Sequence, residues 1–287
     1  KLKAPTDNAT TLDSWAHADY RGAKYYISAD DTINGHMSNI ECLVVHDGTG
    51  AYISSFAEHN SHNSLITLTA DISGTNLRLL ATPSSADIKI KFYRIRLSDS
   101  ESNAEGADSK LCDTVTVSSS ATAIDTFFDT SHTGAHYVIV ARNASEGTAE
   151  ITEATVLTNG AQAFVAQANF VSSKATPMLT LSAAHDGSNT VTLSAASTAG
   201  GSTTVNAFRI HMKVDDAFLY DVIDTFAYSG VQLANYIVVG KNADSQSQIA
   251  ELMVVSDGTA PYILQEGANI STHSTTTPLM NFSVAHN

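Results

Sequence analysis

The chain has 287 residues, enough for two or three domains with ordinary hydrophobic cores, and a formal net charge of -14 from 15 basic and 29 acidic residues. A surface with this charge repels phosphate backbones and anionic lipid headgroups, so we expect neither nucleic acid nor a membrane among its partners. Charged residues make up only 15% of the chain, and Ser, Thr, Ala, Asn and Gly fill the gap. This composition is typical of a β-rich, turn-rich exterior protein.

The first 97 residues consist of short runs in which apolar and polar residues alternate, rich in Val, Ile, Tyr and Thr and closed by Gly, Asn or Asp. This pattern predicts β-strands. Many short strands separated by turn residues favour an antiparallel sandwich or barrel. We expect seven strands in this part of the chain, near residues 11–17, 22–30, 37–46, 50–58, 63–71, 75–82 and 88–97.

The same sequence motifs occur three times along the chain, in the same order. The offset is 112 residues from Asp13 to Asp125 and 99 residues from Asp125 to Asp224. A near-constant offset of about 100 residues indicates tandem domains rather than a solenoid of short units. The three copies read LDSW, AKYYIS and ECLVVHDG from residue 12; IDTF, AHYVIV and EATVLTNG from residue 124; and IDTF, ANYIVVG and ELMVVSDG from residue 223.

We therefore predict an all-β protein of three tandem antiparallel β-sandwich domains, Ig-like or jelly-roll-like. The third copy ends before the counterparts of the last two strands. Either the chain is a piece of a longer polypeptide, or a neighbouring chain supplies the missing strands. The predicted division is residues 1–98 for repeat 1, 99–110 for an acidic polar linker, 111–214 for repeat 2 and 215–287 for a truncated repeat 3.

Each copy carries a turn dipeptide between two strand runs: Asp47-Gly48, Asn159-Gly160 and Asp257-Gly258. Asp-Gly and Asn-Gly tolerate positive φ at both central positions of a two-residue turn. We predict a type I′ hairpin at each of these sites and prefer this interpretation to a ligand-binding loop.

A recurring aspartate, at Asp13, Asp125 and Asp224, precedes Ser or Thr and then a large aromatic residue. A catalytic carboxylate is one interpretation. We favour a side chain that accepts local backbone hydrogen bonds at a strand start, beside an aromatic core residue, because no second acid recurs at a suggestive position.

A recurring glutamate, at Glu41, Glu153 and Glu251, opens the apolar third strand of each copy. Arg94 and Arg209 recur in the last strand of the first two copies. We predict that Glu41 pairs with Arg94 and that Glu153 pairs with Arg209, across a sheet or at its rim. The enzymatic alternative is a two-carboxylate hydrolase.

Histidine pairs occur in EHNSHN and SHTGAH. Glu58, His59 and His62 form one candidate for a metal or binding site, and His132 and His136 a weaker one. Neither set recurs in the other copies, and neither has the spacing of a known zinc motif. We interpret both as solvated loops and assign no metal ligand.

The other candidates for chemistry give no site. Cys42 lies in an apolar strand and Cys112 in a polar connector, so we expect no disulfide. No nucleophile elbow, P-loop or dinucleotide fingerprint is present. We assign no catalytic or cofactor-binding residue, and we expect no cofactor and no enzymatic activity. Four glycosylation sequons, which matter only in a secretory pathway, begin at Asn8, Asn143, Asn269 and Asn281.

The order of motifs resembles a known module. The run from D-S/T-aromatic through AKYYIS, ECLVVHDG and ADISGTNLRLLATP to IKIKFYRIRL resembles a β-sandwich repeat of tailed-bacteriophage structural proteins, especially marine and cyanobacterial ones. The match is best over residues 10–98, and the other copies keep the same order of motifs. The resemblance implies a tail-fibre or surface-appendage segment on the virion, a homo-oligomer, and contacts with other virion proteins. It carries no catalytic residue.

Two further functions stay open. One is a capsid-decorating or glycan-binding adhesin, which would bind a host surface glycan through aromatic residues such as Tyr52 or Tyr262. The other is the subunit of an extracellular filament that is completed by strand donation.

Overall fold

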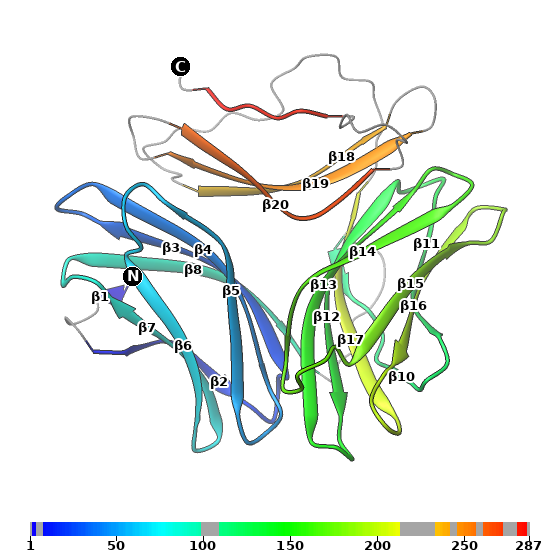
Figure 1. The fold of residues 1–287 in the computed structure, drawn as a ribbon, viewed down its shortest axis with the longest axis horizontal. Coiled ribbons are helices and arrows are strands. Elements are labelled where there is room, and N and C mark those ends of the chain that lie inside the picture. Colours follow the sequence, from blue (N-terminus) through cyan, green and yellow to red (C-terminus); the bar gives the residue numbers. More distant parts are fainter. Residues whose placement is uncertain are drawn as a thin grey trace.

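The computed structural model describes residues 2–3, 8–98, 109–212, 233–241, 246–256, 261–271 and 280–285. All secondary-structure elements assigned in these ranges are β-strands, and all of the strand pairs are antiparallel. This confirms the all-β prediction. The strands form three groups that lie around a common centre, coloured blue to cyan, green to yellow, and orange in Figure 1.

The first group contains eight strands in two sheets. A five-stranded sheet has the order β1-β8-β3-β4-β5, and a three-stranded sheet has the order β2-β7-β6. All seven predicted strands are present within three residues at each end, and the two-residue β1 was not predicted. The strands are β1 (Leu2–Lys3), β2 (Thr10–Ala16), β3 (Gly22–Asp31), β4 (His36–His46), β5 (Ala51–Asn60), β6 (Ile66–Ser73), β7 (Asn76–Pro83) and β8 (Ile88–Leu97).

The second group repeats this order as β10-β17-β12-β13-β14, with β9 added on β17, and β11-β16-β15 as the smaller sheet. Because β9 begins at Ser109, the predicted linker 99–110 runs two residues too far; residues 99–108 lie outside the described ranges. The strands are β9 (Ser109–Leu111), β10 (Val115–Val117), β11 (Thr122–Phe128), β12 (Gly134–Asn143), β13 (Thr148–Thr158), β14 (Ala163–Ser172), β15 (Leu179–His185), β16 (Thr190–Ser197) and β17 (Thr203–Met212).

The third group is a three-stranded sheet, β18-β19-β20, which corresponds to β3-β4-β5. Asp224 and the predicted boundary between residues 214 and 215 lie outside the described residues. The strands are β18 (Leu233–Lys241), β19 (Ser247–Ser256) and β20 (Pro261–Ser271).

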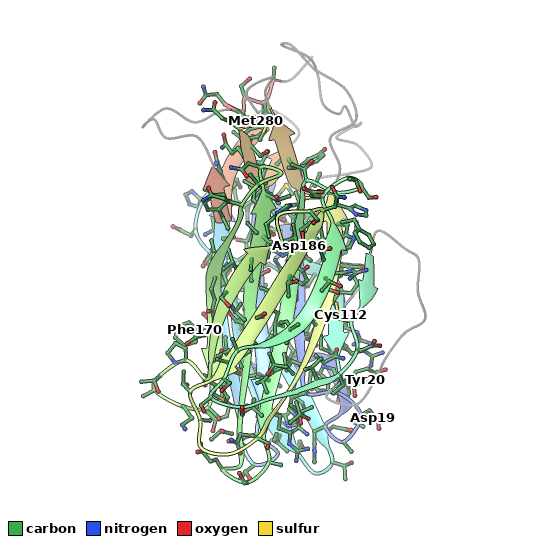
Figure 2. All side chains as sticks on the ribbon, turned by 90° about the vertical axis from the view of Figure 1, so that its right-hand side faces the viewer. Asp19, Tyr20, Cys112, Phe170, Asp186 and Met280 are labelled. Atoms are coloured by element: carbon green, nitrogen blue, oxygen red, sulfur yellow. The ribbon has the colours of Figure 1, made fainter. Side chains whose placement is uncertain are left out.

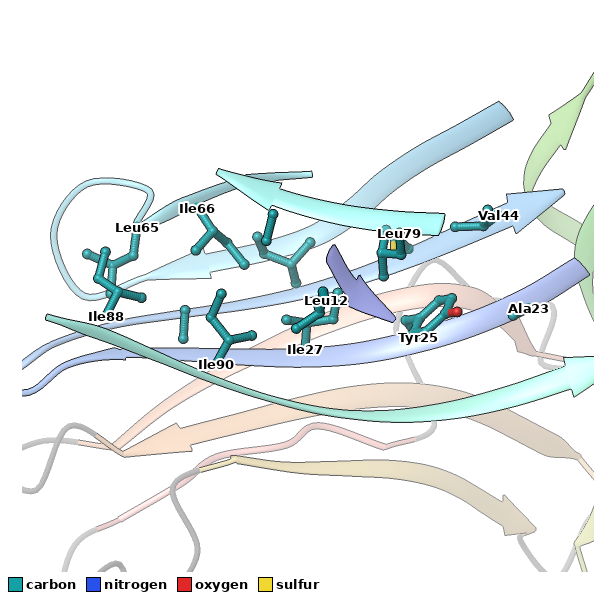
Figure 3. Packing of buried hydrophobic residues seen from close by; sticks show 14 of the residues in the cluster. Leu12, Ala23, Tyr25, Ile27, Val44, Leu65, Ile66, Leu79, Ile88 and Ile90 are labelled. Atoms are coloured by element: carbon teal, nitrogen blue, oxygen red, sulfur yellow. The ribbon is translucent and has the colours of Figure 1, made fainter. Parts of the chain in front are cut away.

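In the first two groups, one hydrophobic cluster lies between the larger and the smaller sheet. In the first group, Tyr25, Ile27 and Val44 from the large sheet pack with Leu12 and Leu79 from the small sheet, and all five are at most 5% exposed (Figure 3). The second group has an equivalent cluster around Tyr137 and Leu193. Alternating residues of each strand supply these cores, as the period of two predicted.

A hydrogen bond from the backbone to a side chain recurs in all three groups. The N–H of Leu65 donates to Ser38 Oγ at 2.9 Å, that of Met178 to Glu150 Oε2 at 2.5 Å, and that of Met280 to Gln248 Oε1 at 2.8 Å. The acceptors are separated by 112 and 98 residues. Met280, at the top of Figure 2, therefore starts a segment in the place where β6 and β15 begin in the other groups.

Substitution of Glu150 by glutamine is expected to stabilise the protein at high pH. Burial raises the pKa of Glu150 to about 7, although hydrogen bonds from Met178, Leu179 and Ser172 act in the opposite direction. The stabilisation from protonating this group is present below pH 4.5 and is lost as the pH rises through 7. Since glutamine already accepts the matched bond at Gln248, Glu150→Gln should raise the free energy of unfolding at pH 8 on the order of 1–3 kcal/mol.

Urea unfolding of Glu150→Gln and wild type at pH 5 and pH 8 checks this expectation. The gain should be confined to pH 8. Glu146→Gln is the matched control, because the exposed Glu146 accepts hydrogen bonds from Lys174 and the Gly200 N–H, which lower its pKa. An equal gain at both pH values, or a gain in the control, would contradict the assignment.

The first and second groups contact each other through the same positions of the repeat as the second and third groups. A methyl group added at Gly22 of β3 would lie 3.2 Å from Ile151 Cδ1 of β13, and one added at Gly134 of β12 would lie 3.7 Å from Ile249 Cδ1 of β19. The two glycines are 112 residues apart and the two isoleucines 98 apart, which are the offsets of the repeat. The first group therefore contacts the second as the second contacts the third, which is a rotational arrangement about a pseudo-threefold axis (Figure 1).

The junctions differ in their chemistry. Between the first and second groups, Leu43, Val45 and Leu97 pack with Val140, Ile151 and other aliphatic side chains in a buried cluster. Between the third and the first, the buried cluster contains Met37, Ala57 and Met253. Residue 39 matches Ile151 but is asparagine, and neither polar atom of its fully buried side chain makes a hydrogen bond. A buried unpaired amide is unfavourable, so Asn39 destabilises the folded chain at the position where the second copy has Ile151.

The predicted hairpins are present, but their turns are not type I′. Four residues, 47–50, separate β4 from β5, and Asp47 Oδ1 accepts the N–H groups of Thr49 and Gly50 at 2.8 Å. Only Gly48 in this loop has positive φ, at 104°. Asn159 makes the matching bonds in the second copy. The aspartate or asparagine is therefore selected for its side-chain oxygen rather than for positive φ. Asp257-Gly258 lies outside the described residues.

Neither Cys42 nor Cys112 is in a disulfide, as expected, and both are buried. Cys112 does not lie in an exposed connector: it belongs to the core of the second group, where its N–H donates to the Ala207 carbonyl (Figure 2). Burial raises the pKa of the Cys42 thiol.

We expect neither thiol to react with a disulfide reagent such as Ellman's reagent while the protein is folded, because both are at most 2% exposed. Both should react in denaturant. Reaction of one equivalent in the native state would show that the cluster around that cysteine opens.

Candidate functional site

The three recurring glutamates meet at one point between the three groups of strands. Glu41 is on β4, Glu153 on β13 and Glu251 on β19. Lys24 Nζ, from β3, lies 2.8 Å from Glu41 Oε2 and 3.1 Å from Glu251 Oε1, and it also donates to Glu153 Oε1. The ammonium therefore ties together carboxylates from all three groups.

Strand register explains why these side chains point inward. In the β3–β4 pair, Lys24 lies opposite Leu43 and Tyr26 opposite Glu41, so all four share the sheet face that is turned away from the core. The ladder shifts register at each glutamate, between Asn39 and Glu41 in the first copy, Thr152 and Glu153 in the second, and Ile249 and Glu251 in the third. A β-bulge at the same place in three sheets is a specific feature of the repeat and not a chance irregularity.

The residue matched to Lys24 is His136 in the second copy and Asn235 in the third. His136 Nε2 lies 3.3 Å from Glu153 Oε1, and Asn235 Nδ2 donates to Glu41 Oε1 at 3.3 Å. Each copy thus contributes one glutamate and one different polar residue. We call Lys24, Glu41, His136, Glu153, Asn235 and Glu251 the central cluster.

The charges of the central cluster are unequal. Burial raises the pKa of Glu41 to about 7, and the nearby Glu251 carboxylate acts in the same direction. Burial would also raise the pKa of Glu153, but Lys24 and His136 together lower it to about 2. Burial opposes the charge of Lys24, yet the carboxylates, Glu153 first, raise its pKa well above its usual value. Near neutral pH the cluster therefore holds an ammonium, an ionised Glu153 and a partly protonated Glu41.

The central cluster is closed to substrates. Lys24 is fully buried, and Glu41, Glu153 and Glu251 are at most 5% exposed. His136, Glu153 and Glu251 bring their ligand atoms within 4.8 Å of one another, a spacing that a metal ion could bridge. Lys24 Nζ already donates to Oε1 of both Glu153 and Glu251. The arrangement is that of an ion-paired junction, in which an ammonium takes the place of a bound cation.

The predicted pairs of glutamate and arginine are wrong. Arg94 lies opposite Tyr25 in the β3–β8 ladder, on the core face, whereas Glu41 lies on the other face. Arg94 instead pairs with Asp13, and Arg209 pairs with Asp125. The glutamates pair with Lys24, which the sequence analysis did not single out.

The recurring aspartate binds across the core rather than to its local backbone. Asp13 Oδ2 accepts a hydrogen bond from Tyr25 at 2.9 Å, and Asp125 Oδ2 accepts one from Tyr137 at 2.9 Å. The aromatic part of the prediction is confirmed, because Trp15 is 4% exposed and its Nε1 donates to the Tyr25 hydroxyl. Each of these Asp-Tyr-Arg sets connects the small sheet to the large one.

The interpretation of both histidine pairs as solvated loops is wrong in part, because His59 lies in β5 and the buried His136 in β12. Glu58 is exposed and accepts a hydrogen bond from Asn60, while the His62 ring stacks on His36. His132 contacts the His211 ring, with the ring centroids 4.3 Å apart, whereas His136 belongs to the central cluster. Among the described residues, only His136, Glu153 and Glu251 group as potential metal ligands.

Two other candidates, Tyr52 for glycan binding and Asn143 for glycosylation, make hydrogen bonds within the chain. The Tyr52 hydroxyl donates to Asp47 Oδ2 at 2.8 Å, and the Tyr262 side chain lies outside the described part of the structure. Asn143 is fully buried and its Nδ2 donates to the Gly200 carbonyl, so this sequon is inaccessible in the folded chain. Asn8 and Asn281 are exposed.

No protein-family model, curated protein or solved structure gives a significant match to the chain. In the part of the chain that the structure describes, there is no long apolar helix of the kind that crosses a bilayer.

Proposed function

We propose that the chain is a structural component of a bacteriophage virion, a tail-fibre or surface-appendage segment that acts through assembly and attachment. In this proposal it is exposed on the particle and contacts other virion proteins and further copies of itself. It has no catalytic activity and needs no cofactor. In this proposal the chain is organised as three tandem antiparallel β-sandwich domains.

The proposal rests on where the recurring carboxylates lie and what they bind. Glu41, Glu153 and Glu251 are buried in one ion-paired junction, and Asp13 and Asp125 bind across the cores. These residues hold sheets together and leave the outer surface as the part that meets a partner. Such use of recurring groups suits a building block. The acidic composition and the resemblance of the repeat to phage modules also support a virion role.

The rotational arrangement adds to the argument. Three copies in one chain surround a pseudo-threefold axis, as three subunits of a trimer would. A single chain of this kind fits a position of threefold symmetry on a particle. The adhesin alternative has less support, because the Tyr52 hydroxyl proposed for glycan contact is bound to Asp47.

Locating the chain on particles tests the proposal. Antibodies raised against the folded chain should label a defined part of purified virions in immunogold electron micrographs, and mass spectrometry should detect the chain in the same particles. A host cytoplasmic protein serves as the marker for contamination. Detection of the chain only in the soluble cell fraction would overturn the virion role, and binding on a glycan array would favour the adhesin.

A further inference from the structure

The central cluster brings a buried lysine and a side-chain amide to the same carboxylate. Lys24 Nζ, from β3, lies 2.8 Å from Glu41 Oε2, and Asn235 Nδ2, from β18, donates to Glu41 Oε1 at 3.3 Å. Asn235 lies opposite Met253 in the β18–β19 ladder, and residues 251 and 253 share a face of β19. Lys24 Nζ reaches this face too, because it lies 3.1 Å from Glu251 Oε1.

The amide of Asn235 has an acceptor that is not in use. Among the described residues, no group donates a hydrogen bond to its buried Oδ1. A half-turn of the amide exchanges Oδ1 with Nδ2 and brings Oδ1 to Glu41. Burial raises the pKa of Glu41 to about 7, so part of the protein carries this group as the acid at neutral pH. The acid form can donate its proton to Oδ1 and so activate the amide carbonyl for attack.

Lys24 is placed to be the nucleophile. Burial opposes the charge of Lys24, but the carboxylates, Glu153 first, raise its pKa well above the usual value. The reactive amine is therefore rare. It forms when Nζ gives one proton to a neighbouring carboxylate, which leaves the total charge of the cluster unchanged. Freshly folded protein is for this reason in the ion-paired state, and any reaction of the amine follows slowly.

We propose that Lys24 and Asn235 form an isopeptide bond, which joins β3 of the first group covalently to β18 of the third. Glu41 is the acid and base of this reaction. The chain reacts once with itself, so no substrate, cofactor or oxidant is needed. The proposal rests on the geometry of the central cluster and does not depend on the virion role.

The reaction is balanced within the cluster. After Lys24 has passed one proton to Glu153, Nζ attacks Cγ of Asn235, the carbonyl electron pair moves to Oδ1, and Oδ1 takes the proton of Glu41. Glu41 then moves a second proton from Nζ to Nδ2. The Cγ–Nδ2 bond breaks, Nδ2 leaves as ammonia, and the proton on Oδ1 returns to Glu41. One C–N bond forms and one breaks, and the proton from Lys24 stays on a carboxylate.

The mass of the intact chain tests the proposal. The purified chain is incubated for a week at physiological temperature, denatured and weighed by mass spectrometry. A growing fraction should become lighter than the sequence by one ammonia molecule. A mass that still equals that of the sequence would overturn the proposal. Loss of one water instead would place the bond on a glutamate and would overturn the assignment to Asn235.

Tryptic digestion identifies the two ends of the bond. Trypsin cleaves after free Lys24 but not after an acylated lysine. The linked protein should therefore release residues 22–78 joined to residues 214–241 as one product. A succinimide at Asn34-Gly35 would also remove one ammonia, but it would leave cleavage after Lys24 intact. Loss of ammonia without the joined product, or a product with another partner, contradicts the proposal.

Variants test the role of each group. Lys24→Arg keeps a cation among the carboxylates, but a guanidinium stays protonated and cannot attack, so the joined product should disappear. Glu41→Gln should slow bond formation at least tenfold, because glutamine cannot transfer protons. Glu146→Gln changes a partly exposed carboxylate and should react like wild type. Circular dichroism checks the folding of each variant, and the wild-type digest decides if one fails to fold. Equal rates for Glu41→Gln and wild type would rule out Glu41 as the acid and base.

Discussion

Replacement of Lys24 by methionine is expected to lower the free energy of unfolding at pH 7 by about 3–5 kcal/mol. The substitution keeps the volume of the side chain but removes the ammonium that binds three buried carboxylates. Glu153 and Glu251 would then face each other without a cation, and all three carboxylates would lose their shared donor. Urea or thermal unfolding of the full chain measures the loss.

The pH dependence identifies the cause. Without the ammonium, burial raises the pKa of the carboxylates above their unfolded value, so the variant should regain more stability than wild type as the pH falls from 8 towards 5. Glu41 and Glu150, with pKa values of about 7, already give wild type a smaller gain over this range. Below pH 4.5, wild type should lose stability that the variant does not have. Its Glu153, with a pKa of about 2, contributes stability above pH 4.5 that is lost as the pH falls towards 2.

Lys174→Met is the matched control for Lys24→Met. Lys174 Nζ donates to Glu146 at 2.6 Å, but about a third of each side chain is exposed. Because exposed ion pairs contribute little, the control should unfold like wild type within error. If Lys24→Met also unfolded like wild type, the central cluster would not be a stabilising junction. Added Glu153→Gln and Glu251→Gln substitutions should restore part of the stability of Lys24→Met, which separates charge repulsion from lost packing.

Local sequence patterns were sufficient for the strands and for the faces of the sheets. The alternation in ECLVV placed Cys42 and Val44 on one face and Leu43 and Val45 on the other, and the structure puts these pairs in two different buried clusters. Apolar residues on both faces of β4 also indicate a strand that is covered on both sides. We did not use this signal to predict contacts between the groups, and it does not say which groups meet.

The pairing of the recurring charges could not be predicted from one strand at a time. Whether Arg94 shares a face with Glu41 depends on the register of β8 and β4 on the intervening β3. The sequence contains no local signal for that register. The shared offset made Glu and Arg look like partners, whereas the actual partner of Arg94 is the equally recurring Asp13.

Lys24 was missed because it does not recur. The comparison of copies favoured positions at which residues agree, but the centre of a pseudo-threefold arrangement needs one cation for three carboxylates. The matched residues Lys24, His136 and Asn235 differ in charge for this reason. A polar residue of changing type within an otherwise apolar strand was the signal that could have located the cluster. It also explains why one chain suits this centre better than three identical subunits, which would place three like residues there.

The second large effect is expected at Asp125 in the core of the second group. Asp125 accepts a hydrogen bond from Tyr137 and pairs with Arg209, which is 9% exposed. Asp125→Ala removes the acceptor and leaves a guanidinium and a phenol buried without a partner. We expect the free energy of unfolding to fall by about 3–5 kcal/mol, measured by urea unfolding.

The matched substitution in the first group sets the scale for this effect. Arg94 is more exposed than Arg209, with 28% of its side chain accessible against 10%, and Tyr25 keeps the hydrogen bond from Trp15 Nε1 when Asp13 is removed. Asp13→Ala should therefore cost less than Asp125→Ala. Asp71→Ala, which breaks an exposed pair with Arg78, should leave stability unchanged within error. Equal losses at Asp125 and Asp13 would contradict the predicted order, which depends on water replacing the lost carboxylate at Arg94 and on the hydrogen bond that Tyr25 keeps.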